Sequence, residues 1–316
     1  MRAKVVAAAL VCSCASAIAQ TVSIGVFGLF HPAEVWVRPG GAEPLCVEDG
    51  VERVKLEGAQ AARFRLGQVS SLSVTSCSGS PADLVVLIPG KIERRFRGVL
   101  TMRPRNTREL IPVIEMDLEA AVASVIAAES APGAGIEALK AQAVVARSFF
   151  VAYHGKQQRH PWFEFCDTTH CQFVRELPGS QTLALSAAQQ TRGLTLTYDR
   201  QVFAPFYSAA CGGHTRSLEG AASYPYFAVA CDYCLRHPAD GIRGHRLGLC
   251  QQGAFGMAAQ GASFRTILNH YFPSTAIEAR PTGVSQMPSK FTKKQSTVMA
   301  GNAFLRNAAA RSSSAK

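Results

Sequence analysis

Short apolar runs separated by glycine, proline and serine fill the first third of the chain. Examples are TVSIGVFGLF, AEVWVRP, SLSVTS and ADLVVLIPG. Runs of this length, bounded by turn-forming residues, are typical of β-strands. The pattern therefore predicts a strand-rich region from Thr21 to about Glu115.

At Asp117 the pattern changes to a helical period. Asp117 can cap the helix DLEAAVASVIAAES, in which apolar residues recur at helical spacing. This helix should stop near the APGAG segment. A second helix should begin near Gly135, with an apolar stripe made by Ile136, Leu139, Ala143, Ala146 and Phe150.

The two predicted helices enclose a short turn that starts with Glu129. Its sequence neighbours Ile126, Ala127, Ala128 and Pro132 are apolar. If the turn is buried, loss of hydration would raise the carboxyl pKa and favour a proton donor near neutral pH. The alternative is a solvated acid at a helix end.

The N-terminal segment has the features of a secretory signal peptide. Arg2 and Lys4 precede the apolar run VVAAALV, and ASAIAQ places small residues where a signal peptidase cleaves. We expect residues 1–19 to be removed and the remainder to be exported to the periplasm or cell envelope. Cys14, behind Ser13, leaves a lipoprotein anchor as the alternative.

The charge of the chain is concentrated at its ends. Of the net charge of +11, the N-terminal segment contributes +2 and residues 280–316 contribute +7, so the body carries about +2. The tail is rich in serine and alanine, which predicts a disordered cationic segment. It could bind an anionic surface or remain solvated. No nucleic-acid motif appears, so no nucleic-acid partner is expected.

An export signal changes what the cysteines mean, because disulfides form in oxidising compartments. Cys46 and Cys77 lie in the strand-rich region, and we expect a structural disulfide between them. A bond closing that loop would contribute about 3 to 4 kcal/mol in the chain-entropy model.

A second group of cysteines lies in FEFCDTTHCQF. Cys166, His170 and Cys171 offer two thiolates and an imidazole, which suit tetrahedral zinc. His160 is the nearest candidate for a fourth ligand. A structural zinc site is the prediction, and a Cys166–Cys171 disulfide is the alternative.

Four further cysteines are Cys211, Cys231, Cys234 and Cys250. In an exported protein we expect two disulfides, in which Cys231 and Cys234 pair with Cys211 and Cys250 rather than with each other. A zinc ion bound by all four is the alternative.

Several motifs in one order resemble the SpoIID/LytB family of peptidoglycan lytic transglycosylases. They are AAESAPGAGIEALKAQAVVARSF, CDTTHCQ, YSAACGGHT, YPYF, GHRLGLCQQGAFGMAAQG and ILNHYFP. The resemblance covers about Gly98 to Phe272. It divides the chain into a signal peptide (1–19), a divergent strand-rich region (20–97), a SpoIID/LytB-like catalytic domain (98–279) and the basic tail (280–316).

The resemblance implies that Glu129 is the catalytic acid and that bacterial wall glycan is the substrate. A lytic transglycosylase cleaves MurNAc–GlcNAc bonds without water and leaves 1,6-anhydroMurNAc ends, so one carboxyl can act as both acid and base. No cofactor is required for that catalysis. The motifs also suggest residues that bind the sugar: Lys140, Gln142, Arg147, Tyr207, Ser208, Gly212, Gly213, His214, His245 and Gln251.

Some of these residues have other interpretations. Lys140 and Arg147 could form an exposed helix face. The CGGHT motif could be a tight turn capped by His214. Arg246 and Leu247 depart from the family pattern, which has Gly-Val after the Gly-His pair, and Arg246 could alter what the groove accepts.

The zinc loop would lie beside the groove and present Asp167, Thr168 and Gln172 to the sugar. The expected fold is an α+β protein, with the helical pair packed at the edge of a strand-rich body and a glycan-binding groove between them. Expected partners are glycan strands, stripped of stem peptides by a separate amidase. Membrane contact would require lipidation or the basic tail.

Two other functions fit parts of this pattern. One is a zinc-dependent amidase or peptidase of the wall, in which His170, His214 or His245 binds a catalytic metal. The other is a non-catalytic glycan-binding module, in which Glu129 only hydrogen-bonds sugar.

Overall fold

The computed structural model describes residues 20–279 apart from 157–159, 177–181, 221–223 and 239–240. The expected signal peptide, its lipoprotein alternative and the basic tail lie outside the described residues. Within those residues, no helix has both the length and the apolar character needed to cross a membrane.

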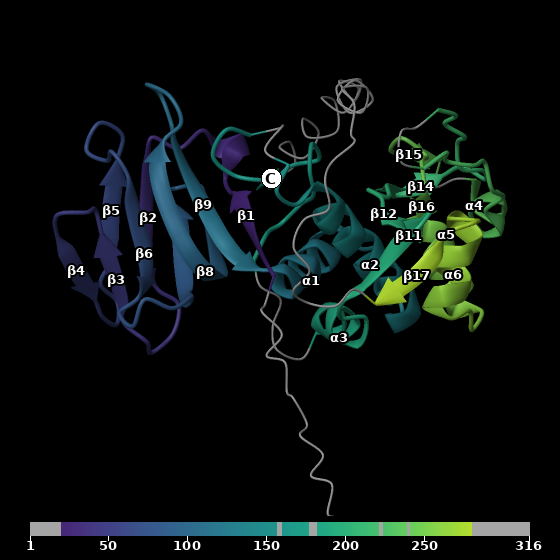
Figure 1. Ribbon diagram of the computed structural model, residues 1–316, viewed down its shortest axis with the longest axis horizontal. Helices are drawn as coiled ribbons and strands as arrows, with labels where there is room; N and C mark the ends of the chain where they lie inside the picture. Colours follow the sequence, from purple (N-terminus) through teal and green to yellow (C-terminus); the bar gives the residue numbers. More distant parts are fainter. Residues whose placement is uncertain (1–19, 157–159, 177–181, 221–223, 239–240, 280–316) are drawn as a thin grey trace, which may run out of the picture.

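The fold is α+β, as expected from the sequence. Figure 1 shows a strand-rich part beside a central group of helices, with smaller sheets and short helices beyond them. The helices are η1 (Gly28–Phe30), α1 (Leu118–Glu129), α2 (Ile136–Tyr153), α3 (Leu183–Gln190), α4 (Asp232–Arg236), α5 (Gln251–Ala259) and α6 (Phe264–Tyr271).

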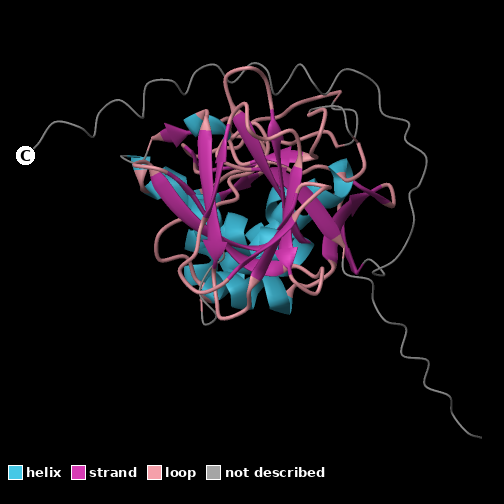
Figure 2. Ribbon diagram, turned by 90° about the vertical axis from the view of Figure 1, so that its left-hand side faces the viewer, coloured by secondary structure: helices cyan, strands magenta, loops and turns pink. Residues whose placement is uncertain are grey.

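A ten-stranded sheet forms the strand-rich part, and it faces the viewer in Figure 2 with helices behind it. Its strands are β1 (Thr21–Gly25), β2 (Glu34–Pro39), β3 (Leu45–Glu48), β4 (Arg53–Leu56), β5 (Ala62–Arg65), β6 (Leu72–Ser76), β7 (Ala82–Ile88), β8 (Ile92–Pro104), β9 (Leu110–Asp117) and β10 (Phe165–Cys166).

The long strand β8 connects two parts of this sheet. Its first half pairs with β7, and its second half pairs with β6 and β9. Gly98 lies where the partner changes, and a Cβ atom there would collide with the carbonyl oxygen of Glu115. The predicted boundary between the divergent strand-rich region and the catalytic domain, at residues 97 and 98, falls inside this strand. The division of the chain into these domains stays a prediction.

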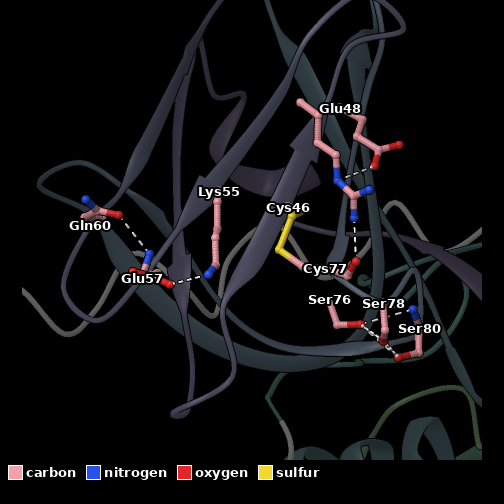
Figure 3. Close-up of a disulfide and its surroundings, with 10 residues drawn as sticks. Cys46, Glu48, Lys55, Glu57, Gln60, Ser76, Cys77, Ser78 and Ser80 are labelled. Atoms are coloured by element: carbon pink, nitrogen blue, oxygen red, sulfur yellow. Dashed lines mark hydrogen bonds and ion pairs between the residues drawn. A yellow bond between two sulfur atoms is a disulfide. The ribbon is translucent and has the colours of Figure 1, made fainter.

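The expected disulfide joins Cys46 of β3 to Cys77, directly after β6 (Figure 3). The two strands are neighbours, with Cys46 opposite Thr75. The bond therefore fastens one part of the sheet, and it lies in a region that contributes no residue to the site described below.

Three small sheets complete the C-terminal part of the fold. Their strands are β11 (Leu194–Tyr198), β12 (Gln201–Val202), β13 (Tyr207–Ser208), β14 (Ala210–Cys211), β15 (Ile242–Arg243), β16 (Leu249–Cys250) and β17 (Ala276–Ala279). Among them, β13 and β16 run parallel, with Tyr207 opposite Leu249 and Ser208 opposite Cys250.

Helix α1 begins where the sequence predicts. The Asp117 side chain accepts hydrogen bonds from the backbone N–H groups of Glu119 and Ala120, which satisfies two of the free donors at the helix start. Because β9 ends at Asp117, the cap also fixes how the chain passes from sheet to helix.

Helix α2 packs on two sides. Its residues Leu139, Ala143 and Phe150 belong to the core shared with α1 and the large sheet, whereas Ala141 and Val145 belong to a second core with the C-terminal elements. The helical pair is therefore covered by the sheet on one side and by the C-terminal elements on the other (Figure 1). Burial on both sides accounts for the apolar character of α2 beyond a single stripe.

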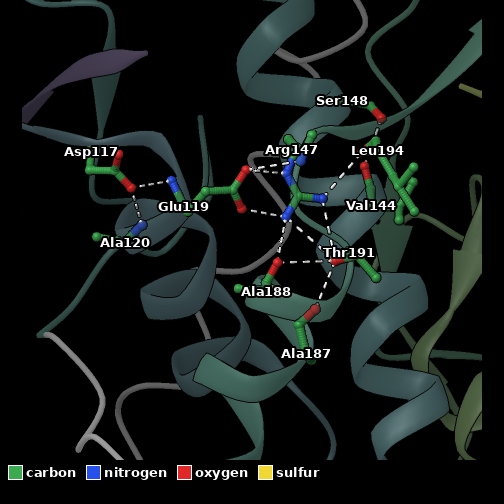
Figure 4. A network of polar contacts seen from close by, with 11 residues as sticks. Asp117, Glu119, Ala120, Val144, Arg147, Ser148, Ala187, Ala188, Thr191 and Leu194 are labelled. Carbon is green, nitrogen blue, oxygen red and sulfur yellow. Dashed lines mark hydrogen bonds and ion pairs between the residues drawn. The ribbon is translucent and has the colours of Figure 1, made fainter. Parts of the chain in front are cut away.

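Arg147 of α2 is the centre of a buried polar network (Figure 4). Its side chain is 1% exposed and pairs with Glu119 of α1 through two nitrogens, with Nε 2.9 Å from Oε1. It also donates to the carbonyl oxygens of Ala188 and Leu194, each at 3.1 Å. The guanidinium thus joins α1, α2, α3 and β11.

This buried position contradicts the alternative of an exposed helix face for Arg147. All three nitrogens donate to protein acceptors, and the side chain has almost no exposed surface. Arg147 therefore joins elements of the fold, and the sugar contact suggested for it stays a prediction.

Replacing Arg147 with methionine should lower the free energy of unfolding by about 3 to 5 kcal/mol, because it leaves the Glu119 carboxylate buried without its partner. Denaturant unfolding followed by circular dichroism measures this loss. The matched control is Arg38→Met, which removes an exposed pair with Glu93 and should cost about 0 to 1 kcal/mol. Equal losses in the two variants would contradict a stabilising role for Arg147.

Candidate active site

Glu129 is the last residue of α1, and three later segments of the chain contact it. Its Oε1 atom accepts the backbone N–H of Phe173 at 2.6 Å. The Tyr207 hydroxyl, which lies 3.4 Å from Gln172 Oε1, is near enough to the Glu129 carboxyl to lower its pKa by hydrogen bonding. The carbonyl oxygen of Glu129 accepts the side-chain amide of Gln251 at 2.6 Å. These partners come from the CDTTHCQ, YSAACGGHT and GHRLGLCQQG motifs or from residues next to them.

Burial raises the pKa of the Glu129 carboxyl above its usual value. The Phe173 N–H, the Tyr207 hydroxyl and the positive charge of Arg175 act in the opposite direction, because each stabilises the carboxylate. Loss of hydration outweighs them, so the site retains a proton on Glu129 to higher pH than water would.

The backbone explains why Tyr207 and Gln251 reach the same acid. Strand β13 carries Tyr207 and pairs with β16, which ends at Cys250 immediately before α5 begins at Gln251. The pairing of β13 with β16 therefore holds the segments of Tyr207 and Gln251 together without the help of Glu129. Burial and the nearby Glu129 charge raise the pKa of the Tyr207 hydroxyl well above its usual value, so it keeps its proton and acts as a donor, with Glu129 and Gln172 Oε1 as its acceptors.

Two buried side chains expected to bind sugar have polar atoms without a hydrogen-bond partner among the described residues. Gln142 accepts the Ser130 hydroxyl through Oε1 at 3.1 Å, which places it next to the Glu129 turn, and its Nε2 has no partner. Ser208 Oγ, beside Tyr207 on β13, also has none. Unpaired buried donors are rare and mark positions where a ligand or water can bind.

His245 is partly buried, and its Nδ1 accepts the backbone N–H of Leu247 at 2.9 Å. Burial, with the charge of Arg216, lowers the pKa of His245 to about 4. The ring is therefore neutral near neutral pH and carries its proton on Nε2, which makes that nitrogen a hydrogen-bond donor.

His214 is exposed, and its carbonyl oxygen accepts two nitrogens of the Arg246 side chain, at 2.8 and 3.1 Å. Arg246, the residue that departs from the family pattern, thus holds the CGGHT turn. No described contact joins the His214 ring to Glu129.

Gly212 and Gly213 have φ angles of 68° and 116°, which favour glycine. Added Cβ atoms would approach Ile242 at 2.6 Å and Leu235 at 2.7 Å, respectively. The neighbours that require these glycines are protein side chains. Their observed function is a tight, closely packed turn, and contact with a sugar stays a prediction.

Lys140 lies on α2, where its Nζ is 2.6 Å from Glu137 Oε1. Glu137 also accepts the backbone N–H of Phe264 at 2.7 Å, at the start of α6. Glu137 therefore links α2 to α6, and no described contact of Lys140 involves Glu129.

The loop after Cys166 differs from the expected arrangement, in which it presents three polar residues to sugar. Asp167 is 2% exposed, pairs with Arg94 at 3.1 Å and accepts the Phe27 N–H at 2.9 Å. Gln172 is 3% exposed and donates to the Ala146 carbonyl. Both side chains point into the protein, where they anchor the loop to the sheet and to α2. The hydroxyl of Thr168 lies 3.2 Å from Cys166 Sγ.

Sequence reasoning missed Phe173 and Arg175. Arg175 donates to the Asp167 carbonyl at 2.7 Å, and its guanidinium lies 4.1 Å from the centre of the Phe173 ring. The positive charge of Arg175 lowers the pKa of the Glu129 carboxyl. Its position four residues after Cys171 was the available signal, since the predicted loop had to pass near the acid.

His160, Cys166, His170 and Cys171 come together as predicted. Their ligand atoms all lie within 4.8 Å of one another, and Cys171 Sγ lies 3.5 Å from His160 Nε2 and 3.6 Å from His170 Nδ1. This cluster could bind a metal ion. The two sulfur atoms are 3.0 Å apart and form no disulfide, since a disulfide bond measures about 2.05 Å.

The cluster is close in sequence to the acid's partner. Hydrogen bonding with Cys171 and with both histidines lowers the pKa of the Cys166 thiol, which favours the thiolate that metals bind. Because Phe173 follows Cys171 by two residues, an ordered cluster fixes the N–H group that Glu129 accepts.

Comparison with known proteins finds similarity over part of the chain. Residues 106–198 match the family of the stage II sporulation protein SpoIID. An uncharacterized protein of Brachyspira hyodysenteriae is 34% identical over 138 residues, which are 44% of this chain and 36% of the relative. This chain thus matches little more than a third of that relative's length. The family match includes β9, α1, α2 and the predicted zinc loop, so this part of the chain is similar to the SpoIID family.

Proposed function

We propose that this protein is an exported lytic transglycosylase that cleaves the glycan strands of peptidoglycan, with Glu129 as its single general acid and base. The family match supports a role connected with sporulation or the cell wall. The observation that carries the finer proposal is the Glu129 carboxyl, whose pKa is raised by burial at a point where three motifs meet.

The proposed reaction needs one carboxyl group. Protonated Glu129 gives its proton to the glycosidic oxygen, and the bond from that oxygen to the anomeric carbon of MurNAc breaks. The C6 hydroxyl of the same sugar then bonds to the anomeric carbon, and its proton returns to Glu129. The products are a free GlcNAc hydroxyl and a 1,6-anhydroMurNAc end, with no water consumed.

The neighbours of Glu129 have matching tasks in this proposal. The Phe173 N–H and the Tyr207 hydroxyl stabilise the carboxylate that forms after the first proton transfer. Gln251 fixes the peptide of Glu129. The unpaired amide of Gln142, the Ser208 hydroxyl and the Nε2–H group of His245 are the donors proposed for the sugar.

Zinc is proposed for the cluster of His160, Cys166, His170 and Cys171. Two sulfur and two nitrogen ligands suit a structural zinc site, in which four protein ligands leave no open position for substrate. The ion would order the loop that carries Phe173. This argues against a zinc hydrolase using the same cluster, because a catalytic zinc needs an open position.

The proposed location and partners rest on sequence. Export follows from the predicted signal peptide, and glycan strands stripped of stem peptides by an amidase are the proposed substrate. The groove that would bind them stays a prediction.

Glu129→Gln should abolish glycan cleavage and leave the fold intact, because the amide cannot donate the proton. Mass spectrometry of digested glycan measures the products, which for the wild-type protein should end in 1,6-anhydroMurNAc. Glu176→Gln changes an exposed acid near the same loop and should keep full activity. Products heavier by one water would show hydrolysis, and cleavage by Glu129→Gln that is lost on chelation would favour a zinc hydrolase.

Tyr207→Phe should move the basic limb of the pH profile to higher pH. The limb follows the pKa of Glu129, because activity is lost as the acid deprotonates. The Tyr207 hydroxyl lowers that pKa, so its removal raises it. The measurement is kcat/KM against pH, with Tyr198→Phe, a tyrosine on β11, as the control. A limb that stays in place or moves to lower pH would count against the assigned contact.

A further inference from the structure

Four cysteines from separate parts of the C-terminal half meet in one buried cluster. Their Sγ atoms all lie within 4.8 Å of one another, and each side chain is at most 2% exposed. Cys211 ends β14, Cys231 caps α4, Cys234 lies in α4 and Cys250 ends β16. The sulfur atoms of Cys234 and Cys250 are 3.6 Å apart.

These distances fit a metal better than they fit disulfides. Four thiolates bound tetrahedrally to zinc, each at about 2.3 Å, lie about 3.8 Å from one another, whereas the sulfur atoms of a disulfide are about 2.05 Å apart. All four cysteines are free, while Cys46 and Cys77 in the same chain are bonded. The expected pairing into two disulfides is therefore not the observed arrangement.

Donors around the cluster also suit bound thiolates. The backbone N–H of Gly253 points to Cys250 Sγ at 3.4 Å, and the Tyr271 hydroxyl points to Cys231 Sγ at 3.5 Å. Outer hydrogen bonds of this kind orient the ligands of a metal. Gly253 leaves room for them, since a Cβ atom there would lie 2.5 Å from Cys231 Sγ.

We propose that Cys211, Cys231, Cys234 and Cys250 bind a structural zinc ion, separate from the cluster of His160, Cys166, His170 and Cys171. The ion joins β14, β16 and α4, which are short elements of two, two and five residues. Four thiolate ligands close the site, so the ion supplies stability and no reaction step.

A zinc ion at this position would also stabilise segments of the candidate active site. Cys250 is followed by Gln251, which donates to the Glu129 carbonyl, and the Cys250 backbone pairs with Ser208, the neighbour of Tyr207. One ion therefore fixes the segments that carry two partners of Glu129. This consequence rests on the proposed function, whereas metal binding does not.

The test is metal and thiol content of the chain purified from an oxidising compartment, and it needs no activity assay. Elemental analysis of the wild-type protein should find two zinc ions per chain. Cys231→Ser with Cys234→Ser should retain one, and the matched control, Cys166→Ser with Cys171→Ser, should also retain one.

A second measurement covers a variant that does not fold. Denatured wild-type chain lacking residues 1–19 should show six reactive thiols in the presence of a chelator, since six of the described cysteines form no disulfide. In the control variant loaded with cobalt, thiolate-to-cobalt absorption should persist, because the four-cysteine site is intact. Two reactive thiols, or no cobalt band in the control variant, would overturn the proposal in favour of disulfides.

Discussion

The site depends on one constraint, which is that Glu129 is partly buried, so that its carboxyl group loses much of its hydration. Burial favours the protonated acid, while one backbone N–H, one hydroxyl and one guanidinium favour the carboxylate. An acid in such a balance can give up a proton and recover it at modest cost. A solvated glutamate at a helix end would be ionised near neutral pH and could not act as the donor.

The rest of the fold keeps the acid in that position. The Asp117 cap fixes the start of α1 against β9, and the Arg147–Glu119 pair fixes α1 against α2. Since α2 is packed between the large sheet and the C-terminal elements, residues from both sides of the molecule can reach the end of α1. Phe173 follows one cysteine cluster by two residues and Gln251 directly follows a cysteine of the other, so metal binding at the two clusters, as proposed, would order both segments.

Much of this arrangement could be predicted from the sequence, because the signals are local. The cap at Asp117, the turn at Glu129 and the spacing of Cys166, His170 and Cys171 depend on residues a few positions apart. The long-range contacts could not be predicted in the same way. A charged Arg147 on a helix suggests a surface or a ligand, and only the fold shows that Glu119 and two carbonyl groups enclose it.

The prediction that Asp167 faces the sugar was wrong for a similar reason. An acid in a polar loop is expected to be exposed, but Arg94, 73 residues earlier in the chain, pairs with it inside the protein. The cysteines after Cys211 show a further limit. Export favours disulfides, and the sequence contains no information on how far apart the four sulfur atoms lie. Phe173 contacts Glu129 through its backbone N–H. Every residue except proline has this group, so the side chain gives no signal for the contact.

The most direct test of the account is the pKa of Glu129 itself. Carbon-13 NMR of chain labelled at the glutamate carboxyl groups, with Glu129→Gln used to assign the signal, follows its titration with pH. The account predicts a midpoint above the about 4.3 of a free glutamate, together with loss of cleavage over the same pH range. A midpoint at or below that value would contradict the claim that burial makes Glu129 the proton donor.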